Sequence, residues 1–435
     1  MKRNVTLWPL IGAVYLMTCG GPFGVEDIVS QSGYLGAILL LLITPVIWAV
    51  PTALMVAELA SALPEDGGYY VWARRAMGPF WGFMGAWLSL TGSIFDMAIY
   101  PTLFVSYLEH FNPAITANGK GLWIGIALVA VSAVLNLGGA RAVSFTSFAF
   151  TALLLSPFLL LSLYSAAHPG PTPVTPAPKF DFLLGLLVAM WNYMGFDNSS
   201  TIAGEVDRPQ RTYPRAMAGA VPLGTLTYIV PIVAVAATGL ASSKWTTGGW
   251  PDVARAVMGA GPATQIVATA ITIGGMMGAF GTFNALTMAL TRLPAALADD
   301  GFLPKMFARR NPKNGAPYVA VVACAVVWAL ALNLSFSKLV ILDVLLTGGS
   351  ILLDFASLVA LRVRAPELPR PYRVPGGLAG AIGIGIGPLA LLTLAVVRNK
   401  AEPVGPINAL QLGVLLIALG VVSYSVNTRF RSKPS

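Results

Sequence analysis

Four carboxylic acids stand inside otherwise apolar stretches of this sequence, where an ionisable side chain is costly and usually has a function. They are Glu26, Asp27, Asp96 and Asp197, and no Lys or Arg shares their depth in any predicted apolar segment. Because burial and mutual repulsion both disfavour the charged form, these carboxylates cannot all be ionised in a dry site. Either protons neutralise some of them or a cation joins them. The pattern predicts a site for an organic cation, for protons, or for both.

Aromatic rings lie close in sequence to these acids. A ring face attracts an ammonium group by about 0.5 to 2 kcal/mol, although ordinary packing is the simpler interpretation of each ring singly. We expect Asp96 and Asp197 to face a central cavity with one of Glu26 and Asp27, since adjacent helical residues point about 100° apart. The candidate binding residues are Gly20, Gly21, Phe23, Glu26, Asp27, Asp96, Tyr100, Trp191, Tyr193, Phe196 and Asp197.

Some acids also allow a structural interpretation. Asp197 is of a residue type that caps a following half-helix. Glu58 and Glu205 fall near segment ends beside arginine-rich loops, and we interpret them as gate or structural ion-pair residues. Asp343 lies near the outer end of its segment. Asp354 lies deeper in the same segment, either lining the outer half of a pathway or packing against another helix.

The elements that must position these residues are membrane-spanning helices. Hydrophobic residues make up 56% of the 435 residues and charged residues 10%, whereas a soluble domain has about 25% charged residues. Apolar runs such as 35–62 are long enough to cross a bilayer as a helix, and they lack the alternation of barrel strands. We predict an all-α integral membrane protein with spans at 8–31, 35–62, 79–108, 122–137, 142–167, 182–204, 216–240, 263–290, 318–334, 339–361, 378–397 and 409–426.

The basic residues indicate an orientation rather than a nucleic-acid site. The formal net charge is +9. With the N-terminus inside, 20 of the 27 Lys and Arg residues fall on the cytoplasmic side, which follows the positive-inside rule. We expect a multi-pass protein of the cell membrane (inner or plasma) with both termini cytoplasmic and no nucleic-acid partner.

Two predicted spans are interrupted at matching places. Span 8–31 contains Gly20-Gly21-Pro22-Phe23-Gly24, and span 182–204 contains Gly195 followed by small and polar residues. Glycine and proline in these numbers are incompatible with a regular helix. Each of the two spans is the first helix of a half that contains five spans, and the two halves enter the membrane from opposite sides. Paired interruptions of this kind indicate the midplane binding site of a transporter.

The sequence shows no pattern typical of a metal site or of an enzyme active site. The two cysteines, Cys19 and Cys324, fall inside spans, and neither His110 nor His168 has a neighbouring ligand pattern. A His-Glu-x-x-His zinc motif is absent. We expect no enzyme activity, no metal and no cofactor.

Several motifs resemble the amino acid–polyamine–organocation (APC) permeases. They include Ala57-Glu58-Leu59 with the segment 64–87, Gly195-Phe196-Asp197 with the segment 204–216, the segment 292–317, and Arg370-Pro371-Tyr372-Arg373-Val374-Pro375-Gly376. The segments Gly20–Asp27 and Phe95–Pro101 look like the plant polyamine uptake transporters and their bacterial relatives.

This resemblance implies a LeuT-like fold of two inverted five-helix repeats, with helices 1 and 6 discontinuous and two peripheral helices. The corresponding units are 1–167, 168–361 and 362–435, within one membrane domain. It also implies a secondary active transporter of polyamines or other cationic amines or amino acids that works by alternating access. The sequence leaves open whether an accessory subunit exists.

The coupling ion and two rival functions stay open. Protons are favoured as the coupling ion because membrane-embedded carboxylates can titrate, although span 5 lacks the lysine of some proton-driven members. Sodium-driven relatives use hydroxyl groups on span 8 beside the break in span 1, and Thr282 and Thr287 could be mistaken for that arrangement. A zwitterionic amino acid symporter or exchanger is the alternative within transport, and a nutrient sensor that binds without transporting is the alternative from another class.

Overall fold

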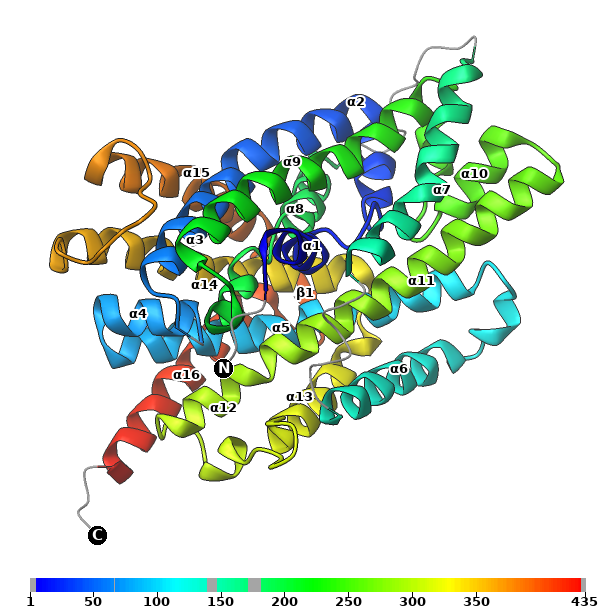
Figure 1. Ribbon diagram of the computed structural model, residues 1–435. Coiled ribbons are helices and arrows are strands. Elements are labelled where there is room, and N and C mark those ends of the chain that lie inside the picture. Colours follow the sequence, from blue (N-terminus) through cyan, green and yellow to red (C-terminus); the bar gives the residue numbers. More distant parts are fainter. Residues whose placement is uncertain (1–4, 66, 139–146, 171–180, 432–435) are drawn as a thin grey trace.

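The structure is a computed structural model that describes residues 5–65, 67–138, 147–170 and 181–431 (Figure 1). Long helices dominate the described residues. They are α1 (Leu7–Thr18), α2 (Glu26–Thr44), α3 (Val50–Ala62), α5 (Pro79–Leu108), α6 (Lys120–Leu137), α7 (Ser147–Ala167), α8 (Phe182–Asn192), α9 (Pro209–Ala236), α11 (Pro262–Leu290), α13 (Tyr318–Leu330), α14 (Phe336–Arg364), α15 (Gly377–Asn399) and α16 (Ala409–Arg431).

Shorter elements connect them. They are the helices α4 (Tyr69–Met77), α10 (Trp250–Met258) and α12 (Arg292–Asp299), the π-helical segment Pro45–Ala49, the 3₁₀ segments Pro113–Ile115, Asp197–Glu205, Ser242–Lys244, Lys305–Ala308 and Ala331–Asn333, and an antiparallel hairpin of β1 (Pro403–Val404) and β2 (Ile407–Asn408). We call Asp197–Glu205 the 197–205 helix.

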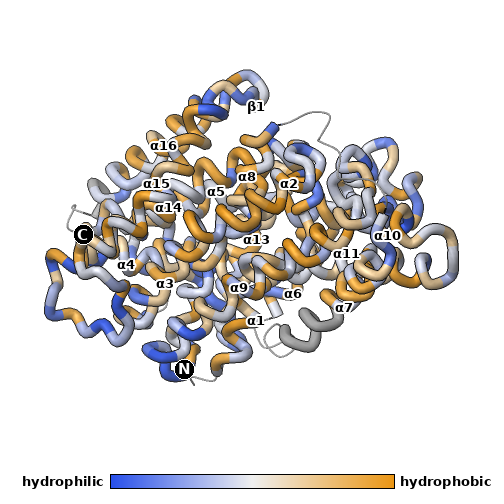
Figure 2. The backbone as a smooth tube through the Cα atoms, turned by 90° about the horizontal axis from the view of Figure 1, so that it is seen from above, coloured by the Kyte–Doolittle hydropathy of each residue, from blue (hydrophilic) through white to orange (hydrophobic). Residues whose placement is uncertain are grey.

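The helices are built for a membrane. Eight of the described helical stretches are long and apolar enough to cross a bilayer, and three shorter apolar helices accompany them. Figure 2 shows hydrophobic residues along the bundled helices and hydrophilic ones mainly in connections and at helix ends. Large apolar side chains such as Trp123, Leu163 and Leu330 are exposed, as expected where lipid takes the place of water.

The first two predicted spans adjoin without an intervening loop. The stretch Glu26–Ala62 is helical except at Gly33, whose φ of +66° turns the chain between the two spans. The π-helical segment Pro45–Ala49 precedes Pro51. Because proline lacks the amide hydrogen that an α-helical ladder needs, a local widening of the helix at this point is expected.

The predicted spans overlap observed helices, but several helix ends differ from the predicted ones. Helix α9 begins at Pro209 rather than at residue 216, because proline is well suited to the first turn of a helix. The helices α4, α10 and α12 fall in segments for which we predicted no helix. The start of the predicted span 142–167 lies outside the described residues. Five of the Lys and Arg residues counted for the orientation also lie outside them, namely Lys2, Arg3, Arg141, Lys179 and Lys433.

Helices α5 and α14 pack closely along the centre of the bundle. A side chain at Gly92 of α5 would collide with Thr347 of α14. Farther along the same interface, the Ser350 hydroxyl donates to the Gly85 carbonyl at 3.0 Å. The small residues Gly92 and Gly85 therefore let α14 approach α5 closely, with Thr347 and Ser350 of α14 facing α5.

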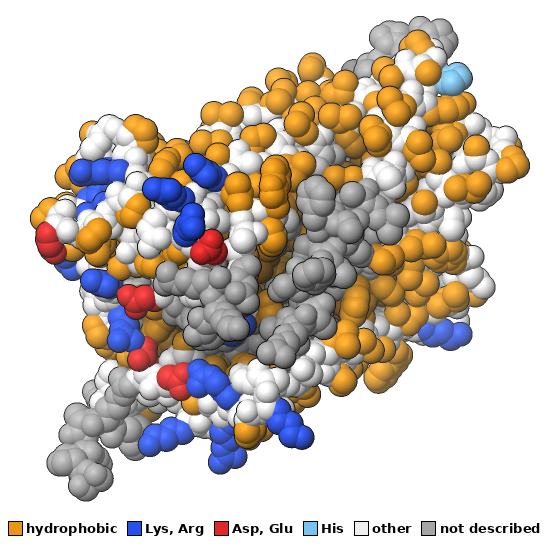
Figure 3. All heavy atoms as spheres, in the orientation of Figure 1, with side chains coloured by type: hydrophobic (Ala, Val, Ile, Leu, Met, Phe, Trp, Pro, Cys, Tyr) orange, Lys and Arg blue, Asp and Glu red, His pale blue; other side chains and the backbone are white. Residues whose placement is uncertain are grey.

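The two ends of the bundle differ in charge. At one end, which we call the α4 end, Arg74 of α4 pairs with Asp300 and Arg364 of α14 donates to the Ala76 carbonyl. Figure 3 shows Lys and Arg side chains gathered over this end of the visible face. At the opposite end, the α10 end, His110 contacts the Gly248 carbonyl.

Candidate functional site

The first helix break lies between α1 and α2 and depends on glycine. Gly20, Gly21 and Gly24 have φ values of +60°, +109° and +83°. A Cβ atom at Gly20 would lie 2.8 Å from the Thr282 hydroxyl, and one at Gly24 would lie 2.8 Å from the Trp191 ring. The left-handed backbone and the close neighbours both exclude a larger residue.

The second break separates α8 from the 197–205 helix and packs directly on the first. Gly195 has a φ of +100°, and a Cβ atom there would lie 2.5 Å from the carbonyl oxygen of Met17. The two interruptions predicted from the sequence therefore meet in space.

Side chains from other helices satisfy the carbonyls that these breaks release. Tyr228 of α9 donates to the Asn192 carbonyl at 2.9 Å, and Thr282 of α11 donates to the Leu16 carbonyl at 3.4 Å. The Trp250 indole of α10 donates to the Pro22 carbonyl at 2.5 Å. Irregular backbone inside a bilayer requires partners of this kind.

A small polar cavity of about 40 Å³ lies where the breaks meet. Residues from α1, the first break, α5, α8, the second break, the 197–205 helix, α11 and α14 line it. They are Met17, Thr18, Cys19, Asp96, Tyr100, Trp191, Asn192, Met194, Gly195, Asn198, Thr282, Asp343 and Thr347. Among the predicted binding residues, Asp96, Tyr100 and Trp191 line this cavity.

Asp96 is the centre of a local hydrogen-bond group. Its Oδ1 atom accepts from the Tyr100 hydroxyl and from the Trp191 indole, both at 3.1 Å. The two rings lie 6.1 Å apart, and Trp191 makes an edge contact with Phe336. An acid and two ring systems thus share one wall of the cavity, an arrangement suited to an ammonium group.

Asp343 is a cavity residue whose role the sequence alone left open. It is 1% exposed and accepts from the Thr347 hydroxyl at 2.6 Å. It lies close enough to Asp96 and Asp197 for the charges to interact. The signal available in the sequence was the spacing of Asp343 and Thr347 by one helical turn inside an apolar segment.

Asp197 lies just behind the cavity wall. It is the first residue of the 197–205 helix, it is 3% exposed, and its Oδ1 atom has no hydrogen-bond partner among the described residues. Its neighbours Gly195 and Asn198 line the cavity, and its charge interacts with that of Asp96.

Glu26 and Asp27 lie away from the cavity, toward the α10 end. Tyr107 of α5 donates a hydrogen bond to Glu26, which is fully buried. The Thr247 hydroxyl lies 2.9 Å and 3.0 Å from the two carboxylate oxygens of Asp27. Both acids stand in the first turn of α2, where the positive end of the helix dipole favours them.

The remaining predicted binding residues have packing roles in this conformation. Phe23 makes edge contacts with Tyr107 and Phe158, each at 5.2 Å between ring centres. The Tyr193 hydroxyl donates to the Leu41 carbonyl at 2.9 Å, and Phe196 is buried. The residues that do not line the cavity are Gly20, Gly21, Phe23, Glu26, Asp27, Tyr193, Phe196 and Asp197.

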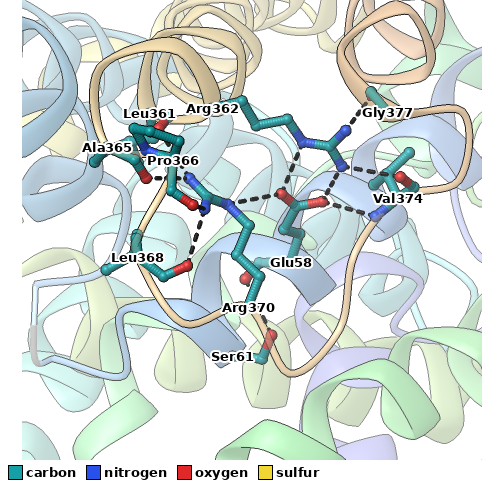
Figure 4. A network of polar contacts seen from close by, with 10 residues as sticks. All are labelled: Glu58, Ser61, Leu361, Arg362, Ala365, Pro366, Leu368, Arg370, Val374 and Gly377. Atoms are coloured by element: carbon teal, nitrogen blue, oxygen red, sulfur yellow. Dashed lines mark hydrogen bonds and ion pairs between the residues drawn. The ribbon is translucent and has the colours of Figure 1, made fainter.

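Glu58 forms a buried ion-pair network at the α4 end (Figure 4). Its carboxylate pairs with Arg362 through two contacts of 3.0 Å and 2.5 Å and with Arg370 at 3.4 Å. It also accepts from the Val374 amide at 2.7 Å. All three charged side chains are at most 7% exposed. The network ties α3, α14 and the α14–α15 connection together.

Ion pairs nearer the surface connect the other elements at this end. Glu205 pairs with Arg292 at 3.2 Å, which joins the 197–205 helix to α12. Asp300 accepts from Tyr70 and pairs with Arg74, which joins α12 to α4. These contacts bring the two predicted ion-pair residues, Glu58 and Glu205, to the same end of the bundle.

The described part of the chain has no group of three His, Cys, Asp or Glu residues suited to a metal ion. Cys19 and Cys324 are free thiols.

Comparisons with known proteins all indicate similarity to membrane transporters. The family model described as amino acid permease matches residues 12–419. The chain is 33% identical over 418 residues to polyamine transporter PUT1 of Oryza sativa subsp. japonica, covering 95% of this chain and 78% of that protein. It is 30% identical over 420 residues to polyamine transporter RMV1 of Arabidopsis thaliana, covering 95% and 84%.

A bacterial protein is also similar. An uncharacterized transporter of Legionella pneumophila is 28% identical over 377 residues, which cover 80% of each chain. These relatives are named as transporters and not as enzymes. Because the family model extends over nearly the whole helical bundle, this chain is a multi-pass membrane protein of the amino acid permease family.

Proposed function

We propose that this protein is a proton-coupled secondary transporter that carries polyamines, or other cationic amines and amino acids, by alternating access. The observation that carries the proposal is the pair Asp96 and Asp343 in one small cavity where two broken helices meet. None of the ion pairs in the described part of the chain uses either acid. A substrate cation would supply the missing positive charge.

The chemistry of the cavity fits an alkylammonium group. A primary amine of this kind resembles the lysine side chain, whose pKa of about 10.4 keeps it charged at neutral pH. Carboxylates would neutralise its charge, and Tyr100 and Trp191 would offer ring faces to it. The names of the relatives support polyamines as the substrate class.

We further propose twelve spans in the LeuT-like arrangement, with repeats at 1–167 and 168–361 and two peripheral helices in 362–435. The eight long apolar helices and the three shorter ones support this count when α8 and the 197–205 helix are taken as one broken span. The basic α4 end would face the cytoplasm and both termini would lie there. The cell membrane is the proposed location.

The small cavity implies movement during transport. Its volume of about 40 Å³ is well below the several hundred Å³ that ordinary ligand pockets provide. Substrate would therefore enter only after the helices around the breaks shift to open one side. Hinged half-helices on either side of a fixed midplane site are suited to such a shift.

The test is uptake of radiolabelled putrescine or spermidine into proteoliposomes, with and without an inward proton gradient. We expect gradient-stimulated uptake that unlabelled neutral amino acids do not compete away. Asp96→Asn should abolish uptake while expression and folding are preserved. The matched control is Asp181→Asn, because Asp181 is an exposed cap of α8 that asparagine can replace.

Three outcomes would contradict parts of the proposal. Accumulation of neutral amino acids without polyamine flux would identify a zwitterionic amino acid carrier. Saturable binding of polyamine without any flux would identify a sensor. Full activity of Asp96→Asn would remove Asp96 from the binding site.

A further inference from the structure

A second cavity lies between α7 and α11, two helices that pack against each other near α10 (Figure 1). Its volume is about 260 Å³, several times that of the polar cavity at the helix breaks. Among the described residues that line it, Ser156 is the one with a polar side chain. The cavity is therefore suited to an apolar occupant.

Small residues on α11 leave this space open. Ala270 and Gly274 both line the cavity and stand one helical turn apart, so they present little side-chain volume to α7. On the other wall, Pro157 interrupts the hydrogen-bond ladder inside α7. A Cβ atom at Gly274 would make only ordinary contacts, at 3.6 Å from the Phe23 ring and 4.0 Å from the Leu154 carbonyl.

The rim of the cavity belongs to the lipid-facing surface of the bundle. Leu160 of α7 and Ile266, Ile273 and Met277 of α11 are exposed apolar side chains that line it. Apolar cavities in proteins stay free of water, and the medium beside these side chains is hydrocarbon. The cavity is thus continuous with the interface between the protein and the acyl chains of the membrane.

The length of the cavity matches one leaflet of a bilayer. From Ile266 to Met277, its wall on α11 extends roughly 16 Å along the helix axis. Half of the hydrocarbon core of a bilayer is about 15 Å thick. Ile266 lies one turn inside the start of α11 at Pro262, on the side of α10. An acyl chain from the leaflet at the α10 end therefore has the length and the depth that this cavity requires.

The inner wall of the cavity touches the first helix break. A Cβ atom at Gly21 would lie 2.6 Å from the Leu154 side chain, so Leu154 packs directly on the break while it also lines the cavity. Gly274 lies against Phe23 of the same break. Phe23 in turn makes an edge contact with Tyr107, which donates to Glu26 at the start of α2. An occupant of the cavity would support this contact chain from the lipid side.

We propose that the cavity between α7 and α11 binds one phospholipid acyl chain from the leaflet at the α10 end, and that the bound chain stabilises the first break in the conformation seen here. A helix of another protein, about 10 Å across with its side chains, is too wide for this space. Without the chain, the lining side chains would lose their contacts on one side. The inference does not depend on which solute the protein carries.

The first test maps where an acyl chain binds. A phosphatidylcholine with a photoreactive diazirine in the middle of one chain is added in small molar excess to the protein in detergent. After illumination, mass spectrometry should find the label on residues 154–160 and 266–277 of the wild-type protein, and on α6 only at higher probe concentration. Equal labelling of α6 and of the cavity segments at low probe concentration would show general lipid contact only, and would overturn the proposal.

A pair of variants controls this result. In Ala270→Phe the new ring occupies the cavity, so labelling of the two segments should be lost. Ala127→Phe places the same ring at an exposed position of α6 and should leave the labelling unchanged. Persistent labelling of the cavity segments in Ala270→Phe, with folding verified by its thermal transition, would contradict the site. Should Ala270→Phe not fold, the distribution of label on the wild-type protein decides.

The second test concerns the support of the break. Addition of ordinary phosphatidylcholine should raise the thermal transition of the wild-type protein and of Ala127→Phe more than that of Ala270→Phe, whose ring already fills the cavity. Equal gains in all three proteins would remove the stabilising role of the chain. Both tests measure the purified protein without transport, so failure of polyamine uptake would contradict the proposed function and leave this inference standing.

Discussion

At the scale of single residues, the glycines at the helix breaks leave no room for a side chain. Gly195 combines a left-handed backbone with a neighbouring carbonyl, that of Met17, at the position a Cβ atom would approach. The contact between the two breaks, and hence the shape of the cavity wall, depends on this one missing atom. Strain introduced here would act directly on Asn198, which lines the cavity.

Gly195→Ala should therefore lower the thermal transition of the purified protein and abolish uptake. The reason is the positive φ together with the 2.5 Å approach to the Met17 carbonyl. Gly224→Ala is the matched control: its Cβ atom would meet Cys19 at an ordinary 3.7 Å, and alanine favours the helix by about 1 kcal/mol. Equal transitions for both variants would show that the break tolerates a side chain.

Local spacing explains which site residues the sequence could reveal. Asp96 and Tyr100 are one helical turn apart, so their contact follows from helix geometry. The partnership of Asp96 with Trp191, and the presence of Asp343 in the same cavity, depend on how α5, α8 and α14 pack. No spacing within one helix contains that information.

At the scale of elements, the buried Glu58 network holds three segments of the α4 end in one arrangement. Glu58 of α3 meets Arg362 of α14 and Arg370 of the α14–α15 connection. Removing one partner of a buried pair typically costs about 3–5 kcal/mol, because the remaining charge is left uncompensated. Loss of the Glu58 charge would leave two buried guanidinium groups, those of Arg362 and Arg370, without their carboxylate partner.

Glu58→Gln should accordingly lower the thermal transition clearly, as measured by tryptophan fluorescence in detergent. Glu65→Gln is the control, since Glu65 pairs with Arg75 at 3.5 Å and both side chains are about half exposed. An exposed pair of this kind contributes at most about 1 kcal/mol. A transition for Glu58→Gln as high as that of Glu65→Gln would mean that the network adds nothing to stability.

Long apolar helices were predictable because the bilayer fixes their length and composition. The predicted span 79–108 coincides with α5, and both helix breaks lie where glycine and proline indicated them. The short helices α4, α10 and α12 were not predicted. Their amphipathic segments become helical by packing their apolar sides on the bundle, as Trp72, Trp250 and Leu297 do.

At the scale of the whole molecule, the distribution of charge makes the orientation testable. Lys120 begins α6 at the α10 end, and Lys313 lies in the connection between α12 and α13 at the α4 end. Both are exposed. The positive-inside rule places the first outside and the second inside the cell.

In a background with Cys19→Ala and Cys324→Ala, Lys120→Cys should react with a membrane-impermeant maleimide in intact cells. Lys313→Cys should react only after the cells are permeabilised. The opposite pattern would reverse the orientation, and labelling of both in intact cells would contradict placing the two connections on opposite sides of the membrane.

The arginines that surround Glu58 also determine where the chain can be engineered. Arg362 donates to the Val374 and Gly377 carbonyls, and Arg370 donates to the Leu361 and Ala365 carbonyls, so side chains hold the backbone of the α14–α15 connection. An epitope or a fiducial domain inserted there would have to break these bonds. The β1–β2 turn is the better insertion point, because nothing lies within 4 Å of a side chain added at Gly405.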